Sequence, residues 1–163
     1  MALDGKDVEL LKELQNDCKQ NLKTLANKLD MKITTVYDRI KKLEADGVIK
    51  GYKAIIDGEK IGITVTAYIF IRFHYYFPQE EILSQEEVAK KISFLPGVQE
   101  VHIIPGEWDM LVKVKGRDVK RIGLFVIDQL RGIRGIDRTL TTDAWFSAKE
   151  SPEIDLNLLK LGK

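Results

Sequence analysis

The sequence predicts an α+β protein with two domains, a helix-turn-helix domain followed by a ferredoxin-like βαββαβ domain. Three observations predict this fold. Two short amphipathic segments flank a turn of three residues at 30–32. Beyond residues 58–63, apolar side chains recur at every second position instead of every third or fourth. From there the segments follow the order strand, helix, strand, strand, helix, strand.

The first part of the chain is expected to form three helices. Asp4 is placed to cap the first helix, which should end between residues 16 and 19. Asn21 is placed to cap the second helix. The third begins near Ile33 and stops at Gly47, a residue suited to a left-handed C-cap. The apolar stripes that would pack these helices are Val8, Leu10, Leu11 and Leu14, then Leu22, Leu25, Ala26 and Leu29, then Val36, Ile40 and Leu43.

A short strand is expected over residues 51–57, before a hinge marked by Gly58 and Gly62. We therefore place the boundary between the two domains at this hinge. The expected organisation is a helix-turn-helix domain at 1–57, a hinge at 58–63, a βαββαβ domain at 64–148 and a C-terminal tail at 149–163.

The outer face of the third helix carries short polar and basic side chains, which can bond base edges and phosphates in a major groove. Nine basic and four acidic residues lie between positions 19 and 53, a local net charge of +5 against +1 for the whole chain. An ordinary helical hairpin with a solvated face is the alternative, and the concentrated charge favours double-stranded DNA as partner. The residues expected to contact DNA are Lys32, Thr34, Thr35, Asp38, Arg39 and Lys42.

These residues are expected to have two different roles in DNA recognition. Thr and Arg side chains at the start of the helix are expected to read bases, whereas the lysines hold phosphates, which positions the protein without specifying sequence. Arg39 has an alternative role, because it can pair with Glu44 or with the first helix instead. Tyr37 is expected to pack rather than to stack on bases.

The second domain begins with an alternating strand from Val65 to Phe73. Both faces of this strand are rather apolar, so we expect helices to cover one face and a partner subunit to cover the other. A helix capped by Ser84 should run to Leu95. The remaining expected elements are a strand over 98–104, a strand through Met110, Val112 and Val114, a helix with the stripe Val119, Ile122, Val126, Ile127 and Leu130, and a strand over 136–146.

Three further side chains in this domain are expected to be structural. Trp145 and Phe146, near the end of the last strand, should be buried. His102 is expected to be an interface or packed histidine rather than a catalyst. The leucines of the tail beyond Pro152 are expected to dock on the body of the chain or on a neighbouring one.

Composition excludes several functional classes. With one cysteine, Cys18, and only His74 and His102, the chain has neither an internal disulfide nor a zinc site of its own. We find no nucleophile–base pair, metal cluster or phosphate-binding glycine loop, so no catalytic residue, metal or cofactor is predicted. No apolar run approaches the roughly 18 residues of a membrane helix, and the acidic start is unlike a signal peptide. Cytoplasmic location is therefore expected.

Motifs in both domains resemble the Lrp/AsnC, or feast/famine, family of prokaryotic transcription regulators. In the first domain the resemblance rests on Leu3-Asp4, Leu25-Ala26, Val36-Tyr37-Asp38-Arg39-Ile40-Lys41-Lys42-Leu43-Glu44 and Gly47-Val48-Ile49-Lys50-Gly51-Tyr52. In the second it rests on Leu95-Pro96-Gly97-Val98 and on Gly106-Glu107-Trp108-Asp109-Met110-Leu111-Val112, which contains the family's Gly-x-x-Asp loop. The two groups of motifs occur in the family's order.

This resemblance implies a winged helix-turn-helix joined to a βαββαβ effector domain. It also implies a homodimer formed through the sheet, and assembly of dimers into tetramers, octamers or larger rings. Amino acids or related metabolites would bind between effector domains and shift assembly or DNA affinity. The expected partners are therefore double-stranded DNA, a small-molecule effector and further copies of the chain.

The chain departs from the family in four places. Asp30 and Lys32 stand in the turn where the family commonly has Gly and Ser. Asp tolerates the left-handed conformation of Gly at some cost, and Lys32 removes the usual N-cap oxygen but can meet a phosphate. The segment 74–82 and the tail after Ala148 are longer than the family's.

The effector is expected to bind at the loop Gly106-Glu107-Trp108-Asp109. Glycine lets a ligand approach the backbone, a carboxylate can hold an α-ammonium group, and free backbone amides can hold an α-carboxylate. Thr139, Thr141 and Thr142 are expected to supply hydroxyl groups to the same cleft. The alternative is structural, with Gly106 making a β-turn and Asp109 capping the loop.

The favoured function is a sequence-specific transcription regulator switched by an amino acid or related metabolite, because two separate sites are what allostery requires. A sirohaem-decarboxylase-like enzyme is a second hypothesis, based on relatives whose DNA-binding half is degenerate. The third hypothesis is an architectural protein that wraps DNA. It differs from the first mainly in the ratio of its affinity for specific sites to its affinity for random DNA.

Overall fold

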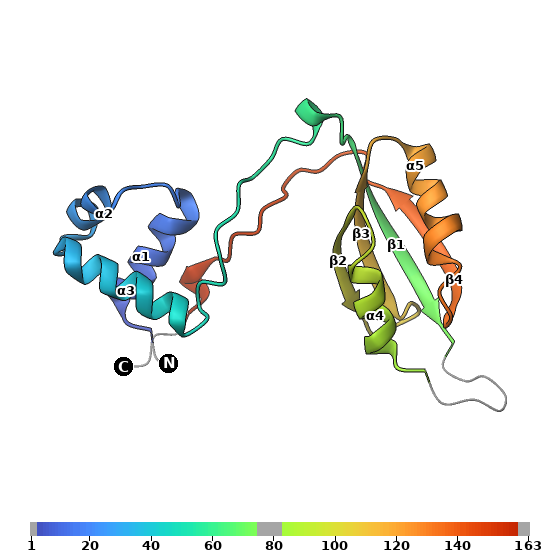
Figure 1. The fold of residues 1–163 in the computed structure, drawn as a ribbon, viewed down its shortest axis with the longest axis horizontal. Helices are drawn as coiled ribbons and strands as arrows, with labels where there is room; N and C mark the ends of the chain where they lie inside the picture. Colours follow the sequence, from blue (N-terminus) through green and yellow to red (C-terminus); the bar gives the residue numbers. More distant parts are fainter. Residues whose placement is uncertain (1–2, 75–82, 160–163) are drawn as a thin grey trace. The chain divides into compact units, whose positions relative to one another are not determined.

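The computed structural model describes residues 3–74 and 83–159, which divide into two compact units. The helical unit combines residues 1–55 with residues 149–163, and the sheet unit comprises residues 56–148 (Figure 1). The segment 74–82, expected to be longer than in the family, lies outside the described residues except for His74. No helix in the described ranges is long and apolar enough to cross a membrane.

The helical unit contains α1 (Gly5–Asn16), α2 (Leu22–Leu29) and α3 (Ile33–Ala45), which confirms the three expected helices. Asp4 caps α1 in a reciprocal capping box, because its carboxylate accepts from the Asp7 amide at 2.8 Å and the Asp7 carboxylate accepts from the Asp4 amide at 3.1 Å. Asn21 caps α2 by accepting from the Thr24 amide at 2.8 Å. The buried stripes of the three helices form one core, made of Leu10, Leu11, Leu25, Ala26, Leu29, Val36 and Leu43.

The turn between α2 and α3 depends on a residue with positive φ. Asp30 has φ 50° and ψ 54°, the left-handed conformation expected from its position in the turn. Lys32 is the residue before α3, and its side chain makes no capping hydrogen bond. The first turn of α3 therefore keeps backbone amides that no cap satisfies, close to a basic side chain.

The expected strand over residues 51–57 is absent, so that prediction is wrong for the chain by itself. No described residue pairs with this segment through a β ladder, and a strand without a neighbour leaves its backbone groups to water. Its apolar side chains are exposed as a result: Ile55 is 87% exposed and Ile56 is 67% exposed.

The C-terminal tail returns to the helical unit and docks on α1. The Gln15 side-chain amide bonds the backbone of Ile154 twice, accepting from its N–H at 2.8 Å and donating to its carbonyl at 3.0 Å. Lys12 Nζ donates to Asn157 Oδ1 at 2.6 Å. Leu156, in a short 3₁₀ turn, packs against the helical core. The chain therefore enters and leaves the helical unit through two separate connections.

We expect Leu156→Ala to lower the free energy of unfolding of the helical unit by about 1–2 kcal/mol, because its side chain is only partly buried and fully buried leucines lose more. Leu158→Ala is the matched control, since Leu158 is 79% exposed and should change little. Denaturant unfolding followed by far-ultraviolet circular dichroism measures both. Equal effects of the two substitutions would contradict docking of the tail through Leu156.

The sheet unit has four strands, β1 (Val65–Phe73), β2 (Val98–Ile103), β3 (Met110–Gly116) and β4 (Ile136–Asp143). They lie in the order β2-β3-β1-β4 with every neighbouring pair antiparallel, which confirms the ferredoxin-like prediction. One face is covered by α4 (Gln85–Ser93) and α5 (Val119–Leu124) (Figure 1). Ser84 caps α4 as expected.

The second helix of the sheet unit differs from the predicted stripe. After α5, residues Phe125–Leu130 form a π-helical turn, which inserts an extra residue per turn and rotates the following side chains. Phe125 is buried, whereas Ile127 is 59% exposed. Val119, at the start of α5, is equally exposed. The prediction is therefore right for Ile122, Val126 and Leu130 and wrong for Val119 and Ile127.

The last strand is shorter than expected, and its terminal aromatic residues are not buried. The ladder with β1 ends when the Ala144 amide donates to the Thr66 carbonyl at 2.8 Å, because β1 begins at Val65 and offers no further partner. Trp145 is 100% exposed and Phe146 is 85% exposed, so the expected burial is wrong within a single chain.

Candidate nucleic-acid interface and effector region

The outer face of α3 forms a continuous exposed stripe. Thr34, Tyr37, Asp38, Lys41 and Lys42 are exposed and follow the spacing i, i+3, i+4, i+7 and i+8, so they lie on one side of the helix. Four of the six residues predicted to contact DNA are exposed, namely Lys32, Thr34, Asp38 and Lys42. A helix that presents short polar and basic groups along one side matches what a major groove accepts.

Lys32 and Lys42 have no carboxylate partner among the described residues, as is true of several other lysines of the helical unit, whereas three lysines are paired. Lys6 pairs with Glu9 and Lys28 pairs with Glu13, for example. Among these unpaired lysines, Lys42 lies on α3 and Lys32 directly precedes it, so both ammonium groups are placed to meet phosphates there.

Arg39 takes the alternative role that its position allowed. Its Nη1 donates to Asp4 Oδ2 at 2.8 Å and to Asp7 Oδ1 at 2.5 Å, so the guanidinium group joins α3 to the start of α1. The side chain is only 27% exposed. The two carboxylates raise the pKa of the Arg39 guanidinium, and the Asp7 amide followed by Arg39 lowers the pKa of Asp4. A base-reading role for Arg39 is therefore not supported by this geometry.

We expect the stability of the helical unit to fall as the pH drops below the ordinary Asp pKa of 3.8. The pKa of Asp4 is lowered in the folded chain, so its contribution is fully present above the unfolded value and is lost as pH falls through the folded one. Arg39→Met should flatten this dependence below about pH 4, because it removes one of the interactions that lower the pKa of Asp4. Urea unfolding by circular dichroism at several pH values measures the effect, and an unchanged profile in the variant would contradict it.

Two exposed residues of the α3 face, Tyr37 and Lys41, were not predicted as contacts. Lys41 Nζ lies 5.9 Å from the centre of the Tyr37 ring and 3.0 Å from Glu44 Oε2. The Tyr52 hydroxyl donates to the other oxygen of Glu44 at 3.1 Å. These contacts fix Lys41 and Tyr37 relative to the segment that leaves the helical unit. The signal that identifies both is helical spacing, since they fall between the polar residues of the same stripe.

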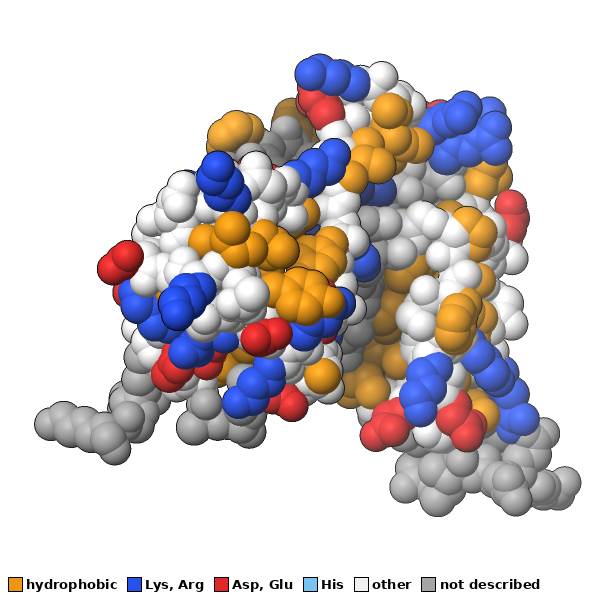
Figure 2. Space-filling model, turned by 60° about the vertical axis from the view of Figure 1, so that its left-hand side comes forward, with side chains coloured by type: hydrophobic (Ala, Val, Ile, Leu, Met, Phe, Trp, Pro, Cys, Tyr) orange, Lys and Arg blue, Asp and Glu red, His pale blue; other side chains and the backbone are white. Residues whose placement is uncertain are grey.

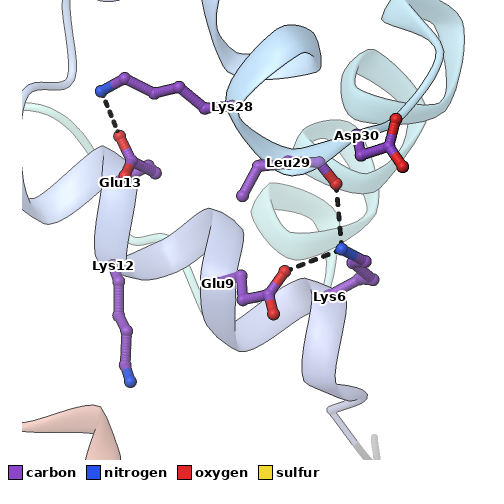
Figure 3. Close-up of a pocket in the computed structure, with 7 residues that line it drawn as sticks. All are labelled: Lys6, Glu9, Lys12, Glu13, Lys28, Leu29 and Asp30. Atoms are coloured by element: carbon purple, nitrogen blue, oxygen red, sulfur yellow. Dashed lines mark hydrogen bonds and ion pairs between the residues drawn. The ribbon is translucent and has the colours of Figure 1, made fainter.

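A charged groove lies elsewhere in the helical unit, between α1 and the end of α2 (Figure 3). Lys6 Nζ donates to the last carbonyl of α2, that of Leu29, at 3.0 Å and to Glu9 at 3.0 Å. Lys28 Nζ lies 2.6 Å from Glu13, and its hydrogen bond lowers the pKa of Glu13. The labelled side chains mostly satisfy one another, so we interpret this groove as a helix-packing contact rather than a ligand site.

The loop Gly106–Asp109, predicted from the sequence to bind an effector, is anchored to the first strand of the sheet unit. The Asp109 amide donates to the Ile71 carbonyl at 2.9 Å, and Asp109 Oδ2 accepts from the Phe73 amide at 2.8 Å. Gly106 has φ 129°, and nothing lies within 4 Å of the position a Cβ would occupy. The Asp109 carboxylate therefore has the structural role weighed from the sequence, while Gly106 leaves open space beside the loop.

Trp108 of this loop packs on the open face of the sheet, by which we mean the face not covered by α4 and α5. Its ring lies 6.1 Å from the ring of Phe70, at an interplanar angle of 50°. The register places Thr142 opposite Tyr68, on the same open face. Thr139 and Thr141 lie opposite buried residues of β1, on the helix-covered face. The expectation that all three hydroxyl groups share one cleft is therefore wrong.

The open face carries an apolar centre with charged residues around it. Phe70 lies opposite Leu111 on β3 and opposite Leu140 on β4, so the three side chains form a row across three strands. Leu140 is 48% exposed. Figure 2 shows patches of hydrophobic side chains among Lys and Arg on the face of the molecule that it draws. A contiguous row of apolar side chains, with Leu140 exposed and Phe70 and Leu111 only partly buried, indicates a surface for association.

His102 lies on β2 at the margin of this face, opposite Leu111. It is not packed within the chain, because 55% of its side chain is exposed. Its Nε2 is 3.2 Å from Glu100 Oε2, and Lys113 Nζ is 3.2 Å from Glu100 Oε1. These hydrogen bonds lower the pKa of Glu100. The position leaves open the interface role expected for His102.

Comparison with protein families agrees with both units. Residues 3–50 match the winged helix-turn-helix DNA-binding family, and residues 66–154 match the Lrp/AsnC ligand-binding domain, which spans more than half of the chain. The chain belongs to the Lrp/AsnC family. It is a helix-turn-helix transcriptional regulator with a ligand-binding domain.

The named relatives of this regulator are also transcriptional regulators. An uncharacterized HTH-type transcriptional regulator of Pyrococcus horikoshii is 41% identical over 148 residues, which cover 91% of this chain and 96% of that one. The HTH-type transcriptional regulator FL11 of the same organism is 30% identical over 156 residues, covering 96% and 98% of the two chains.

Solved structures confirm the fold of the regulator. The chain resembles an AsnC-family transcriptional regulator of Agrobacterium tumefaciens with a TM-score of 0.86 and 26% identity, over 96% of this chain and 100% of that one. It also resembles a Neisseria meningitidis transcriptional regulator, solved in complex with L-methionine, with a TM-score of 0.86 and 22% identity over 95% and 97% of the chains. The second likeness is evidence of the fold alone.

Proposed function

We propose that this regulator binds specific sites on double-stranded DNA as a homodimer or larger assembly, and that an amino acid or related metabolite changes its DNA affinity. The observation that carries the proposal is the exposed stripe of α3, together with Lys32 and Lys42, which have no carboxylate partner among the described residues. In this proposal Thr34 and Thr35 read bases, Lys32 and Lys42 hold phosphates, and Asp38 faces the same groove. Arg39 supports these residues by fixing α3 on α1.

The row of Phe70, Leu111 and Leu140 supports association through the open face of the sheet. A two-fold interface uses the same patch on both copies, so one apolar row suffices to form it. Two helical units in such a dimer would contact half-sites about one turn of DNA apart. Dimers would then assemble further, as tetramers or octamers.

An amino-acid effector is supported by the family and by the loop at Gly106–Asp109. The Neisseria meningitidis relative was solved with an amino acid bound. In our proposal the ligand site lies on the sheet unit, and the DNA site lies on α3 of the helical unit. Coupling between two such sites is typically about 1–3 kcal/mol, enough for a several-fold to hundredfold change in DNA affinity.

A regulatory rather than enzymatic role is part of the same proposal. The relatives are transcriptional regulators, and the helical unit keeps a basic recognition face. No cofactor is needed for this activity. The cytoplasm is the compartment where such a protein would meet a prokaryotic chromosome.

The function is tested by footprinting the purified protein on the DNA upstream of its own gene, with and without each proteinogenic amino acid. We expect protected segments spaced about one helical turn apart, and at least one amino acid that changes the protein concentration required. Uniform protection of any DNA, insensitive to all amino acids, would instead indicate an architectural protein.

A further inference from the structure

Two arginines face each other on the open side of the sheet. Arg72 on β1 lies directly opposite Arg138 on β4, and both are exposed. Side chains at directly opposed positions of an antiparallel pair point to the same face and lie close together. Like charges in this arrangement repel, so such a pair is expected only where something else compensates it.

Neither arginine has a carboxylate partner in the part of the chain that the structure describes. Arg72 Nη2 donates to the Glu107 carbonyl at 3.1 Å. The Arg138 guanidinium carbon lies 5.8 Å from the centre of the Trp108 ring. A carbonyl oxygen and an aromatic face orient the two cations without neutralising them. Among the described residues, therefore, no carboxylate compensates these two neighbouring positive charges.

The loop that both arginines contact, Gly106–Asp109, is held in place by the sheet unit itself. Asp109 anchors it to the backbone of β1, donating its amide to Ile71 and accepting from the Phe73 amide through its carboxylate, and Trp108 packs against Phe70. Both arginines contact this loop, so their guanidinium groups are preorganised, which reduces the entropy lost on binding. Glu107 is exposed on the same loop, and its carboxylate has no partner among the residues described.

We propose that Arg72 and Arg138 together bind the carboxylate of a small zwitterionic ligand, whose ammonium group meets Glu107 and whose apolar part lies against Trp108. Guanidinium groups match the planar geometry of a carboxylate and bind it through paired hydrogen bonds. Because the effector of the proposed function is an amino acid, this inference rests on that function and names the groups that recognise its two charges. The proposed ligand site therefore lies on the open face of the sheet, whereas Thr139 and Thr141 lie on the helix-covered face.

The test measures the thermal unfolding midpoint of the full chain with each of the twenty proteinogenic amino acids and, separately, with inorganic phosphate. We expect at least one amino acid to raise the midpoint by about 4 °C or more at saturating concentration. Arg72→Gln and Arg138→Gln should each abolish that rise. Arg131→Gln should preserve it, since Arg131 is an exposed arginine just beyond the π-helical turn of the same unit.

Three further measurements show which groups of the ligand and the protein raise the unfolding midpoint. The carboxamide derivative of the active amino acid should give no rise, because it lacks the carboxylate. Glu107→Gln should weaken the response to the amino acid but leave any response to phosphate intact. A midpoint raised by phosphate alone would overturn the zwitterionic ligand and leave only a general anion.

Two other outcomes would overturn the inference. One is that no amino acid raises the midpoint, or that the rise persists in both arginine variants. The other is that Arg72→Gln and Arg138→Gln weaken self-association without affecting any ligand response, which would mean that a partner's carboxylate covers the pair. Binding of the variants to a DNA duplex without amino acids separates this failure from failure of the proposed function, because that binding should match the unsubstituted protein.

Discussion

Lys42→Glu is expected to weaken binding to duplex DNA by about tenfold or more at low ionic strength. Lys42 lies on the exposed stripe of α3 and has no carboxylate partner in the described ranges, so its charge is available to a phosphate. Reversing the charge at this position removes an attraction to the phosphate and adds a repulsion in its place. The loss should be similar on specific and random sequences, because a phosphate contact carries no sequence information.

The same substitution should reduce the dependence of the DNA dissociation constant on salt, by about one unit in the slope of its logarithm. Fluorescence anisotropy with a labelled duplex at several salt concentrations measures both quantities. Lys90→Glu is the matched control: it makes the same charge change on α4, an exposed helix of the sheet unit. If the two variants bind DNA equally well, α3 is not the surface that meets the phosphates.

The second large effect is expected from Phe70→Glu, which places a carboxylate at the centre of the row formed with Leu111 and Leu140. Burying an unpaired charge in an apolar interface costs several kcal/mol, so the dimer dissociation constant should rise by about a hundredfold or more. The variant should also bind DNA more weakly, because a monomer contacts a single half-site.

Phe94→Glu is the matched control, because it makes the same replacement of phenylalanine by glutamate at another position. Phe94 is 88% exposed and follows α4, on the helix-covered side of the sheet, so this substitution should leave association intact. Sedimentation velocity measures the oligomeric state of both variants, and circular dichroism verifies that both are folded. Association of Phe70→Glu at the level of the unsubstituted protein would exclude the open face as the subunit interface.

The fold was predictable because its signals are local. Asp4, Asn21 and Ser84 each cap a helix as their positions indicated. Residues 65–73 alternate with period two and form the central strand β1. Hydrophobic periodicity and capping depend on residues a few positions apart, so a single sequence contains the information needed.

The structural predictions failed where an element needs a partner that is distant in sequence, or where the backbone is irregular. The segment 51–57 and the residue Trp145 have β-like sequences, yet the chain supplies no strand beside them. Periodicity assumes regular helix geometry, so the π-helical turn at Phe125–Leu130 could not be anticipated. Where an element lacks a neighbour, propensity alone does not determine its structure.

The candidate sites were predictable as regions rather than as individual contacts. The α3 face was found from charge and spacing, but the direction of Arg39 depends on Asp4 and Asp7, more than thirty positions away in sequence. The loop Gly106–Asp109 was proposed as an effector site from its motif, and that role stays a prediction. The opposition of Arg72 and Arg138 is a matter of strand register, which sequence does not reveal without the pairing of β1 and β4.

The central claim is that one surface of this chain meets DNA while another joins it to a second copy. Sedimentation equilibrium of the full chain, mixed with a duplex of the DNA upstream of its own gene at low ionic strength, tests both parts together. The account predicts complexes with at least two chains on each duplex. A lone monomer sedimenting beside free duplex would contradict it.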